Sequence, residues 1–265
     1  MKVDYHVHTS MCGHAYGTME ESVLAALGGG FDEIGFADHL PLLYCDDLTL
    51  SMKPVELPLY VERVLELKER YAGRITVRLG IEADYCTETV GSVARMLEAH
   101  PFDYVLGSVH ILSGWIFDDP RDVGRYDSLD IDALYHEYYE AERDLARTGL
   151  FDVLSHPDLL KKFGRRPAGD MSDEVEALLG ALKEGDMPFE VNTAGLRWPA
   201  AEIYPSQSFV DAGAGQGVAV TMGSDAHSPG DVGRDFGVAL DSLKKAGYEE
   251  LAVFSGRKMR TAPLP

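Results

Sequence analysis

The stretch V-D-Y-H-V-H at residues 3–8 opens the chain with an apolar run that ends in two histidines. Alternate residues of a strand face the same side, so His6 and His8 are predicted to project together from one strand end. Further along the chain, short apolar runs alternate with longer amphipathic segments. This alternation is typical of βα units that build a parallel sheet.

The alternation predicts seven βα units. The predicted strands are Val3–Val7, Ile34–Ala37, Ile75–Ala83, Tyr104–Val109, Val153–Ser155, Phe189–Asn192 and Val218–Met222. The predicted helices begin near Thr18 and Leu57 and continue with Val90–Glu98, Ile131–Arg147, Ser172–Glu184, a short helix at Val210, and Phe236–Ala246. A loop rich in Leu, Pro and Asp follows the second strand, residues 111–129 form a long loop, and Leu251–Phe254 is a short final strand. Such regularity favours a parallel barrel, whose active site lies at the carboxyl ends of the strands.

Potential metal ligands gather at the predicted strand ends. A-D-H at 37–39, G-I-E-A-D at 80–84, G-S-V-H at 107–110, S-H-P-D at 155–158 and G-S-D-A-H at 223–227 all occupy such positions. With the first motif and the loop after it, the candidates are His6, His8, His14, His39, Glu82, His110, His156, Asp225 and His227. Imidazoles and carboxylates suit Zn, Mn or Fe, and this set is too large for one ion. Because buried charges without partners are costly, we expect a site for about two to three divalent ions.

The composition limits the possible partners. The 265 residues are 45% hydrophobic and carry a formal net charge of -20. Nucleic acids and anionic membranes need a basic face, so neither is an expected partner. An anionic small molecule remains compatible, because a few arginines and bound cations can dominate one pocket.

The three cysteines, Cys12, Cys45 and Cys86, are widely spaced and form no C-x-x-C motif. Such cysteine usage fits a reducing compartment. The chain enters a strand directly after M-K and has no apolar run of membrane-spanning length. We therefore expect a cytoplasmic protein, a monomer or small homo-oligomer.

Taken in order over residues 4–227, the histidine and carboxylate motifs resemble the signature of the PHP (polymerase and histidinol phosphatase) superfamily. The resemblance implies an α/β fold in which residues 1–265 form a single metallophosphatase domain, a distorted (β/α)7 barrel. It also implies how the ligands are shared. The first ion would take His6, His8, Glu82 and Asp225; the second would share Glu82 and take His110 and His156; the third would take His14, His39 and His227.

Longer motifs resemble the histidinol-phosphate phosphatase branch: C-G-H-A at 12–15, A-D-H-L-P at 37–41, G-S-V-H-I-L-S-G-W-I-F-D at 107–118, E-V-N-T-A-G-L-R at 190–197 and E-I-Y-P-S at 202–206. This branch implies metal-dependent hydrolysis of L-histidinol phosphate to L-histidinol and phosphate in histidine biosynthesis. One alternative is a PHP phosphoesterase that acts on another small phosphate ester or a nucleotide. Another is a metal-binding barrel without catalysis.

Candidate residues for catalysis and substrate binding surround these motifs. Arg197 follows a strand end and is the predicted phosphate clamp, because a guanidinium matches two phosphate oxygens. Lys161, or its neighbour Lys162, is a second clamp candidate in a basic loop that includes Arg165 and Arg166. Asp38 is predicted either to support a ligand histidine or to protonate the leaving oxygen. Asp225 and His227 are also predicted to take part in catalysis. Trp115, with Phe117, Asp118 and Asp119, either covers the imidazole and amine of histidinol or, for Trp115, forms the core of its loop.

Overall fold

The computed structural model describes residues 1–45, 47 and 49–265; residues 46 and 48, in the predicted loop after the second strand, lie outside the described part. Seven strands form one sheet in the order β1-β2-β3-β4-β7-β8-β9, and every neighbouring pair is parallel. These strands are β1 (Val3–Val7), β2 (Glu33–Phe36), β3 (Thr76–Asp84), β4 (Tyr104–Ser108), β7 (Val153–Leu154), β8 (Phe189–Asn192) and β9 (Val220–Gly223).

The first and last strands of this sheet meet and nearly close a barrel. A parallel bridge joins Val7 to Ala226, just beyond the end of β9. The backbone N–H of His8 donates to the carbonyl of Ala226 at 2.9 Å, and the N–H of Ala226 donates to the carbonyl of His6 at 3.1 Å. The predicted (β/α)7 barrel is confirmed, and its closure depends on the H-V-H segment itself.

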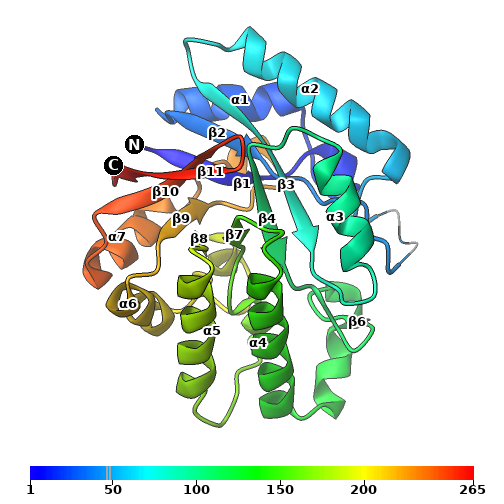
Figure 1. The fold of residues 1–265 in the computed structure, drawn as a ribbon, viewed down its shortest axis with the longest axis vertical. Helices are drawn as coiled ribbons and strands as arrows, with labels where there is room; N and C mark the ends of the chain where they lie inside the picture. The colour runs from blue at the N-terminus through cyan, green and yellow to red at the C-terminus, as the bar shows by residue number, and fades with distance from the viewer. Residues whose placement is uncertain (46, 48) are drawn as a thin grey trace.

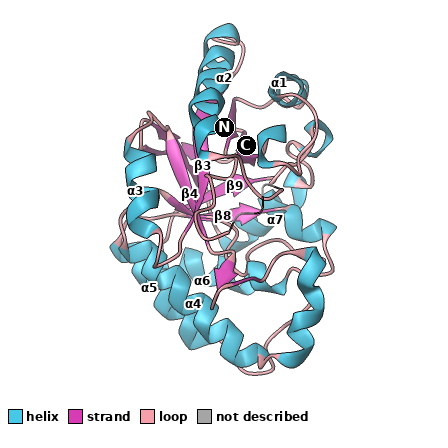
Figure 2. Cartoon of the chain, turned by 90° about the vertical axis from the view of Figure 1, so that its right-hand side faces the viewer, coloured by secondary structure: helices cyan, strands magenta, loops and turns pink. Residues whose placement is uncertain are grey.

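One helix follows each barrel strand, and the helices surround the strands (Figures 1 and 2). They are α1 (Met19–Gly28), α2 (Leu57–Arg70), α3 (Val90–Glu98), α4 (Ile131–Arg147), α5 (Ser172–Glu184), α6 (Gln207–Gln216) and α7 (Phe236–Ala246). The first helix begins as predicted after Thr18, which is its N-cap, and Glu21 completes a capping box. Among the described residues, no helix has the length and apolar character to cross a membrane.

Two predicted segments are more ordered than their sequence indicates. The predicted loop 111–129 contains a short hairpin, β5 (Ile111–Leu112) and β6 (Trp115–Ile116), and a 3-10 segment at Pro120–Ser128. The predicted final strand is half of an antiparallel hairpin, β10 (Glu250–Ser255) and β11 (Lys258–Pro263). Figure 1 shows this hairpin beside β1 and β9, with the two chain ends close together.

The barrel end opposite the predicted ligands is filled by aromatic side chains. The ring of Tyr104, from β4, lies 5.0 Å from the ring of Tyr5 and 6.0 Å from that of Phe254 in β10. Its hydroxyl donates to the carbonyl of Tyr5 at 2.6 Å. A Cβ on Gly35 or Gly80 would lie 2.1 or 2.2 Å from Tyr104, so glycines on two neighbouring strands make room for this ring.

We expect Gly35→Ala to lower the free energy of unfolding by about 1–3 kcal/mol, because the added methyl group overpacks the ring of Tyr104. Denaturant unfolding measures this change. Gly91→Ala, in α3, is the matched control, because a Cβ there meets nothing within 4 Å; it should be neutral or stabilise the helix by up to about 1 kcal/mol. Equal stability of the Gly35→Ala variant and the wild type would contradict the packing described for this end of the barrel.

Candidate metal centre

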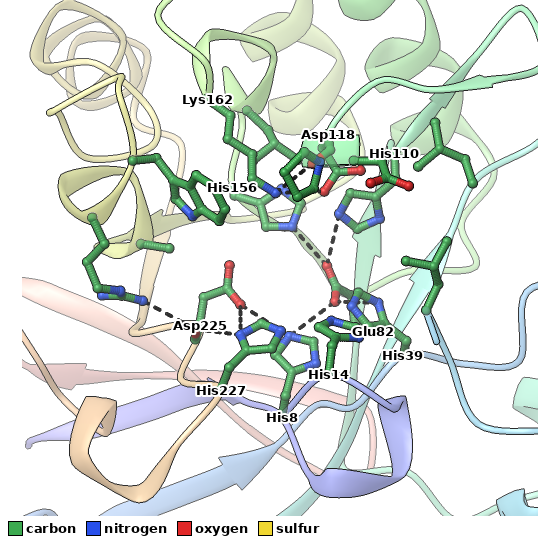
Figure 3. Close-up of a pocket in the computed structure, with 18 of the residues that line it drawn as sticks. His8, His14, His39, Glu82, His110, Asp118, His156, Lys162, Asp225 and His227 are labelled. Carbon is green, nitrogen blue, oxygen red and sulfur yellow. Dashed lines mark hydrogen bonds and ion pairs between the residues drawn. The ribbon is translucent and has the colours of Figure 1, made fainter. Parts of the chain in front are cut away.

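The predicted ligands converge at the carboxyl ends of the barrel strands (Figure 3). They come from β1, β3 and the loops that follow β1, β2, β4, β7 and β9. A cavity of about 550 Å³ lies above them, and eight of the nine line it: His8, His14, His39, Glu82, His110, His156, Asp225 and His227. His6 is fully buried behind this layer.

The carboxylate of Glu82 lies at the centre of the cluster. Its Oε1 accepts a hydrogen bond from Ser108 at 2.7 Å and lies 2.8 Å from Nε2 of His156 and 3.6 Å from Nε2 of His110. Its Oε2 lies 3.0 Å from Nδ1 of His39 and 3.4 Å from Nε2 of His6. The two oxygens therefore face different groups of imidazoles, as a carboxylate shared by two ions would.

Two further groups of donors complete the cluster. The Nε2 atoms of His6 and His8 are 3.1 Å apart, and Oδ1 of Asp225 lies 3.2 Å from Nε2 of His8. Ligand atoms of His14, His39 and His227 all lie within 4.8 Å of one another, as do those of His6, His8 and Glu82. The structure thus brings all the predicted ligands together, while their assignment to individual ions stays a prediction.

The residues present fit divalent metal ions. Oε2 of Glu82 is buried, and none of the described residues donates a hydrogen bond to it, although imidazole nitrogens surround it. A buried carboxylate oxygen that accepts no hydrogen bond and lies close to several imidazole nitrogens is costly unless a cation lies between them. Imidazole and carboxylate donors in such numbers suit Zn, Mn or Fe.

The carboxylates and imidazoles of the cluster shift one another's pKa values. Burial would raise the pKa of Glu82, but His39 and His6 outweigh it and hold the pKa well below its ordinary value. Burial and the neighbouring His8 lower the pKa of His227 to about 3. Burial would lower the pKa of His110, but Asp84 and Asp118 outweigh it and raise the pKa to about 10. Because neutral imidazole is the form that coordinates metals, an ion bound at His110 would displace a proton.

Two acidic residues that the sequence analysis passed over support the ligand histidines. Glu190, in β8, lies 2.9 Å from Nδ1 of His6, and Asp84, at the end of β3, lies 2.8 Å from Nδ1 of His110. Each belongs to a motif already quoted, at an alternate position of a buried strand. A charged residue on the inner face of a predicted strand was the indication that could have identified them.

Asp38 is fully buried and is not among the described residues that line the cavity. It accepts hydrogen bonds from the hydroxyl of Thr9 and the backbone N–H of His39, and its Oδ1 lies 3.6 Å from Nδ1 of His8. Of its two predicted roles, the geometry favours support of ligand histidines over direct protonation of a leaving group.

Arg197 lines the cavity, as a phosphate clamp requires. Its Nη2 donates to the backbone carbonyls of Ser224 at 2.6 Å and Asp225 at 3.3 Å. Its Nη1 is buried and has no hydrogen-bond partner within the described part of the chain. One nitrogen therefore anchors the guanidinium beside the cluster, and the hydrogen-bonding capacity of the other is unfilled.

The structure contradicts the prediction that Lys161 contacts the substrate. Lys161 is fully buried, and its Nζ donates to Asp158 at 2.7 Å and Glu202 at 3.0 Å. It therefore ties the segment after β7 to the segment that contains Glu202. Of the two lysines, Lys162 lines the cavity; its Nζ donates to Oδ2 of Asp118 at 3.1 Å and lies 4.6 Å from the ring of Trp198.

Trp115 is also turned away from the cavity, contrary to its predicted contact with substrate. It is buried in its own loop, where its ring lies 4.8 Å from that of Tyr126 and 5.0 Å from the guanidinium of Arg125. The alternative role, as loop core, is the one observed. Asp118 and Asp119 from the same loop do line the cavity. So do two aromatic residues that the sequence analysis did not identify, Trp198 and Tyr204.

Comparison with known proteins identifies the family to which this chain belongs. The model of the PHP domain matches residues 4–194. The chain belongs to the PHP domain family. The resemblance noted in the sequence is thus confirmed.

Several relatives of this PHP domain match over nearly their full length. A probable histidinol-phosphatase of Deinococcus radiodurans is 40% identical over 97% of this chain and 98% of its own. The histidinol-phosphatase of Bacillus subtilis is 30% identical over 91% of this chain and 98% of its own. The crystal structure of the Lactococcus lactis histidinol phosphate phosphatase, complexed with zinc, L-histidinol and phosphate, has a TM-score of 0.84 at 24% identity and covers 98% of both chains. At 24% identity, the similarity to this crystal structure is evidence of the fold alone.

We expect His8→Ala and Asp225→Ala each to bind about one metal ion fewer per chain than the wild type, because each removes a direct ligand from the cluster. Metal analysis after reconstitution and desalting measures the difference. His136→Ala is the matched control, because this histidine is exposed on α4 and pairs with Glu174. Full metal content in both cluster variants would contradict the proposed centre.

Proposed function

We propose that this chain is a histidinol-phosphatase, which hydrolyses L-histidinol phosphate to L-histidinol and phosphate in histidine biosynthesis. The observation that carries the proposal is the full-length match to relatives of that name, at 40% and 30% identity, together with a complete ligand cluster beside an anchored arginine. We further propose that residues 1–265 act as one catalytic domain, cytoplasmic, as a monomer or small homo-oligomer.

The cluster would hold two to three divalent ions, Zn, Mn or Fe, on the ligands found together here. Such ions lower the pKa of water towards about 7 and neutralise charge on a phosphoryl group, which makes hydrolysis possible at neutral pH. We propose that Asp225 and His227 contribute to catalysis as ligands of these ions. Asp38 is proposed to position His8.

Phosphate binding is assigned to Arg197. Its guanidinium is fixed by the backbone carbonyls of Ser224 and Asp225, so little side-chain freedom is lost when it binds a phosphate oxygen. Lys162 adds a second positive charge on the wall of the cavity, and it replaces Lys161 in this role.

Recognition of the cationic end of the substrate is assigned to Asp118 and Asp119. Burial would raise the pKa of Asp118, but Lys162 and His110 outweigh it and hold the pKa below its ordinary value. An ionised carboxylate on the cavity wall suits an ammonium or imidazole group. The same cavity is lined by the cationic Arg197 and Lys162 and by these carboxylates, which matches a phosphate ester that carries an amine.

The proposal is tested by steady-state phosphate release from L-histidinol phosphate, a nucleoside monophosphate and p-nitrophenyl phosphate, on protein of measured metal content. We expect kcat/KM for L-histidinol phosphate to exceed the other two by at least about 100-fold, the equivalent of about 3 kcal/mol of contacts to the imidazole and amine. Equal or greater efficiency on the nucleotide would reassign the site to another PHP phosphoesterase. Metal content without hydrolysis of any of the three would support a binding domain.

Arg197→Ala should lower kcat/KM for the preferred substrate by about 10- to 100-fold, because a charge-assisted hydrogen bond contributes roughly 1.5–3 kcal/mol. Arg165→Ala is the control, because Arg165 pairs with Asp127 and is not among the described residues that line the cavity. Unchanged kcat and KM in the Arg197 variant would remove this residue from the site.

A further inference from the structure

Every barrel strand except β8 supplies a predicted metal ligand from its end or from the loop after it. In place of a ligand, β8 supplies Glu190, whose side chain is fully buried. Its Oε1 lies 2.9 Å from Nδ1 of His6, and its Oε2 accepts the backbone N–H of His156 at 2.9 Å. One carboxylate therefore contacts two ligand residues that are predicted to serve different ions.

The contact with His6 determines which imidazole nitrogen is free. A carboxylate accepts hydrogen bonds only, so Nδ1 of His6 carries the proton and donates to Glu190. Nε2, which faces His8 and Glu82, is then left with its lone pair towards the cluster. A partner of this kind fixes the tautomer and the ring orientation of a metal-binding histidine.

The contact with His156 holds an unusual backbone. His156 has a φ of 25°, which is a strained conformation for a residue with a side chain. The hydrogen bond from its N–H to Glu190 stabilises this turn, which directs Nε2 of His156 to Glu82 at 2.8 Å. The orientation of a second ligand thus depends on the same carboxylate.

Neighbouring residues are shaped around Glu190. A Cβ on Gly223, in β9, would lie 1.9 Å from Oε1 of Glu190 and 2.5 Å from Cβ of His6, so only glycine leaves room for this pair. Asn192 donates to Oε2 of Glu190 at 3.0 Å and accepts the N–H of Ala194 at 2.8 Å. Three donors therefore converge on the two oxygens of one carboxylate. A glutamine of the same shape has only one acceptor oxygen and could not accept all three hydrogen bonds equally well.

We propose that Glu190 is a positioning residue that orients His6 and His156 together and so couples two metal positions of the cluster. This role rests on the proposed function, in which the cluster is the hydrolytic site. Glu190 itself does not reach the substrate, because it is fully buried and is not among the described residues lining the cavity.

The test compares metal affinity in Glu190→Gln, Glu190→Asp and the wild type, by competition of each apoprotein with a chromophoric chelator for Zn²⁺ and Mn²⁺. Glu190→Gln keeps the size of the side chain but presents an N–H₂ group to one of the three donors. We expect about 10- to 100-fold weaker binding of the ions, because loss of an outer hydrogen-bond partner has that typical effect. Glu190→Asp keeps two acceptor oxygens and should recover part of the affinity.

Glu142→Gln is the matched control, because Glu142 is another buried glutamate, in α4, that contacts none of the described ligands. Circular dichroism and unfolding of each variant confirm that it is folded. Wild-type affinity in Glu190→Gln, or an equal loss in Glu142→Gln, would overturn the proposal. Because the readout uses no substrate, it stands apart from the proposed function, which fails separately if the wild type does not prefer L-histidinol phosphate.

Discussion

The arrangement of this protein depends on one buried carboxylate that several imidazoles share. Glu82 presents its two oxygens to different groups of histidines at the closed end of a cavity. Like charges and unpaired polar atoms at such close range in a low-dielectric interior are stable only when opposite charge joins them. Bound cations meet this requirement, so the same constraint that shapes the strand ends also implies the chemistry of the site.

The packing at the opposite end of the barrel helps to hold the ligands in these positions. Tyr104 fills the interior over Gly35 and Gly80, and the β10–β11 hairpin covers the ring with Phe254. A tightly packed base leaves the strands little freedom to shift relative to one another. Rigid strands carry the ligands more accurately than long loops do.

Behind the ligands lies a layer of acidic residues: Glu190 next to His6, Asp84 next to His110, and Asp38 near His8. Asp84 and Asp38 come from the end of a barrel strand or the residues directly after it, as the ligands do, and Glu190 comes from within β8. Parallel strands that end at the same level therefore supply both the ligands and the groups that orient them. This arrangement also explains Gly223 of the G-S-D-A-H motif, which leaves room for the pair of Glu190 and His6.

The sequence by itself determined the order of the βα units and the ligand types, because hydrophobic periodicity and strand-end motifs are local properties of the chain. The residues Val90–Glu98 and Ile131–Arg147, for example, are helices with the predicted bounds. Closure of the barrel depends on the contact of Val7 with Ala226, which are distant in sequence. Only the tertiary structure decided which neighbours of these motifs face the cavity. Lys161 and Lys162 are adjacent in the chain, yet one is buried in an ion pair and the other lines the cavity. Trp115 packs on Tyr126 while Trp198 reaches the site, because the direction of a loop side chain is set by packing between segments distant in sequence.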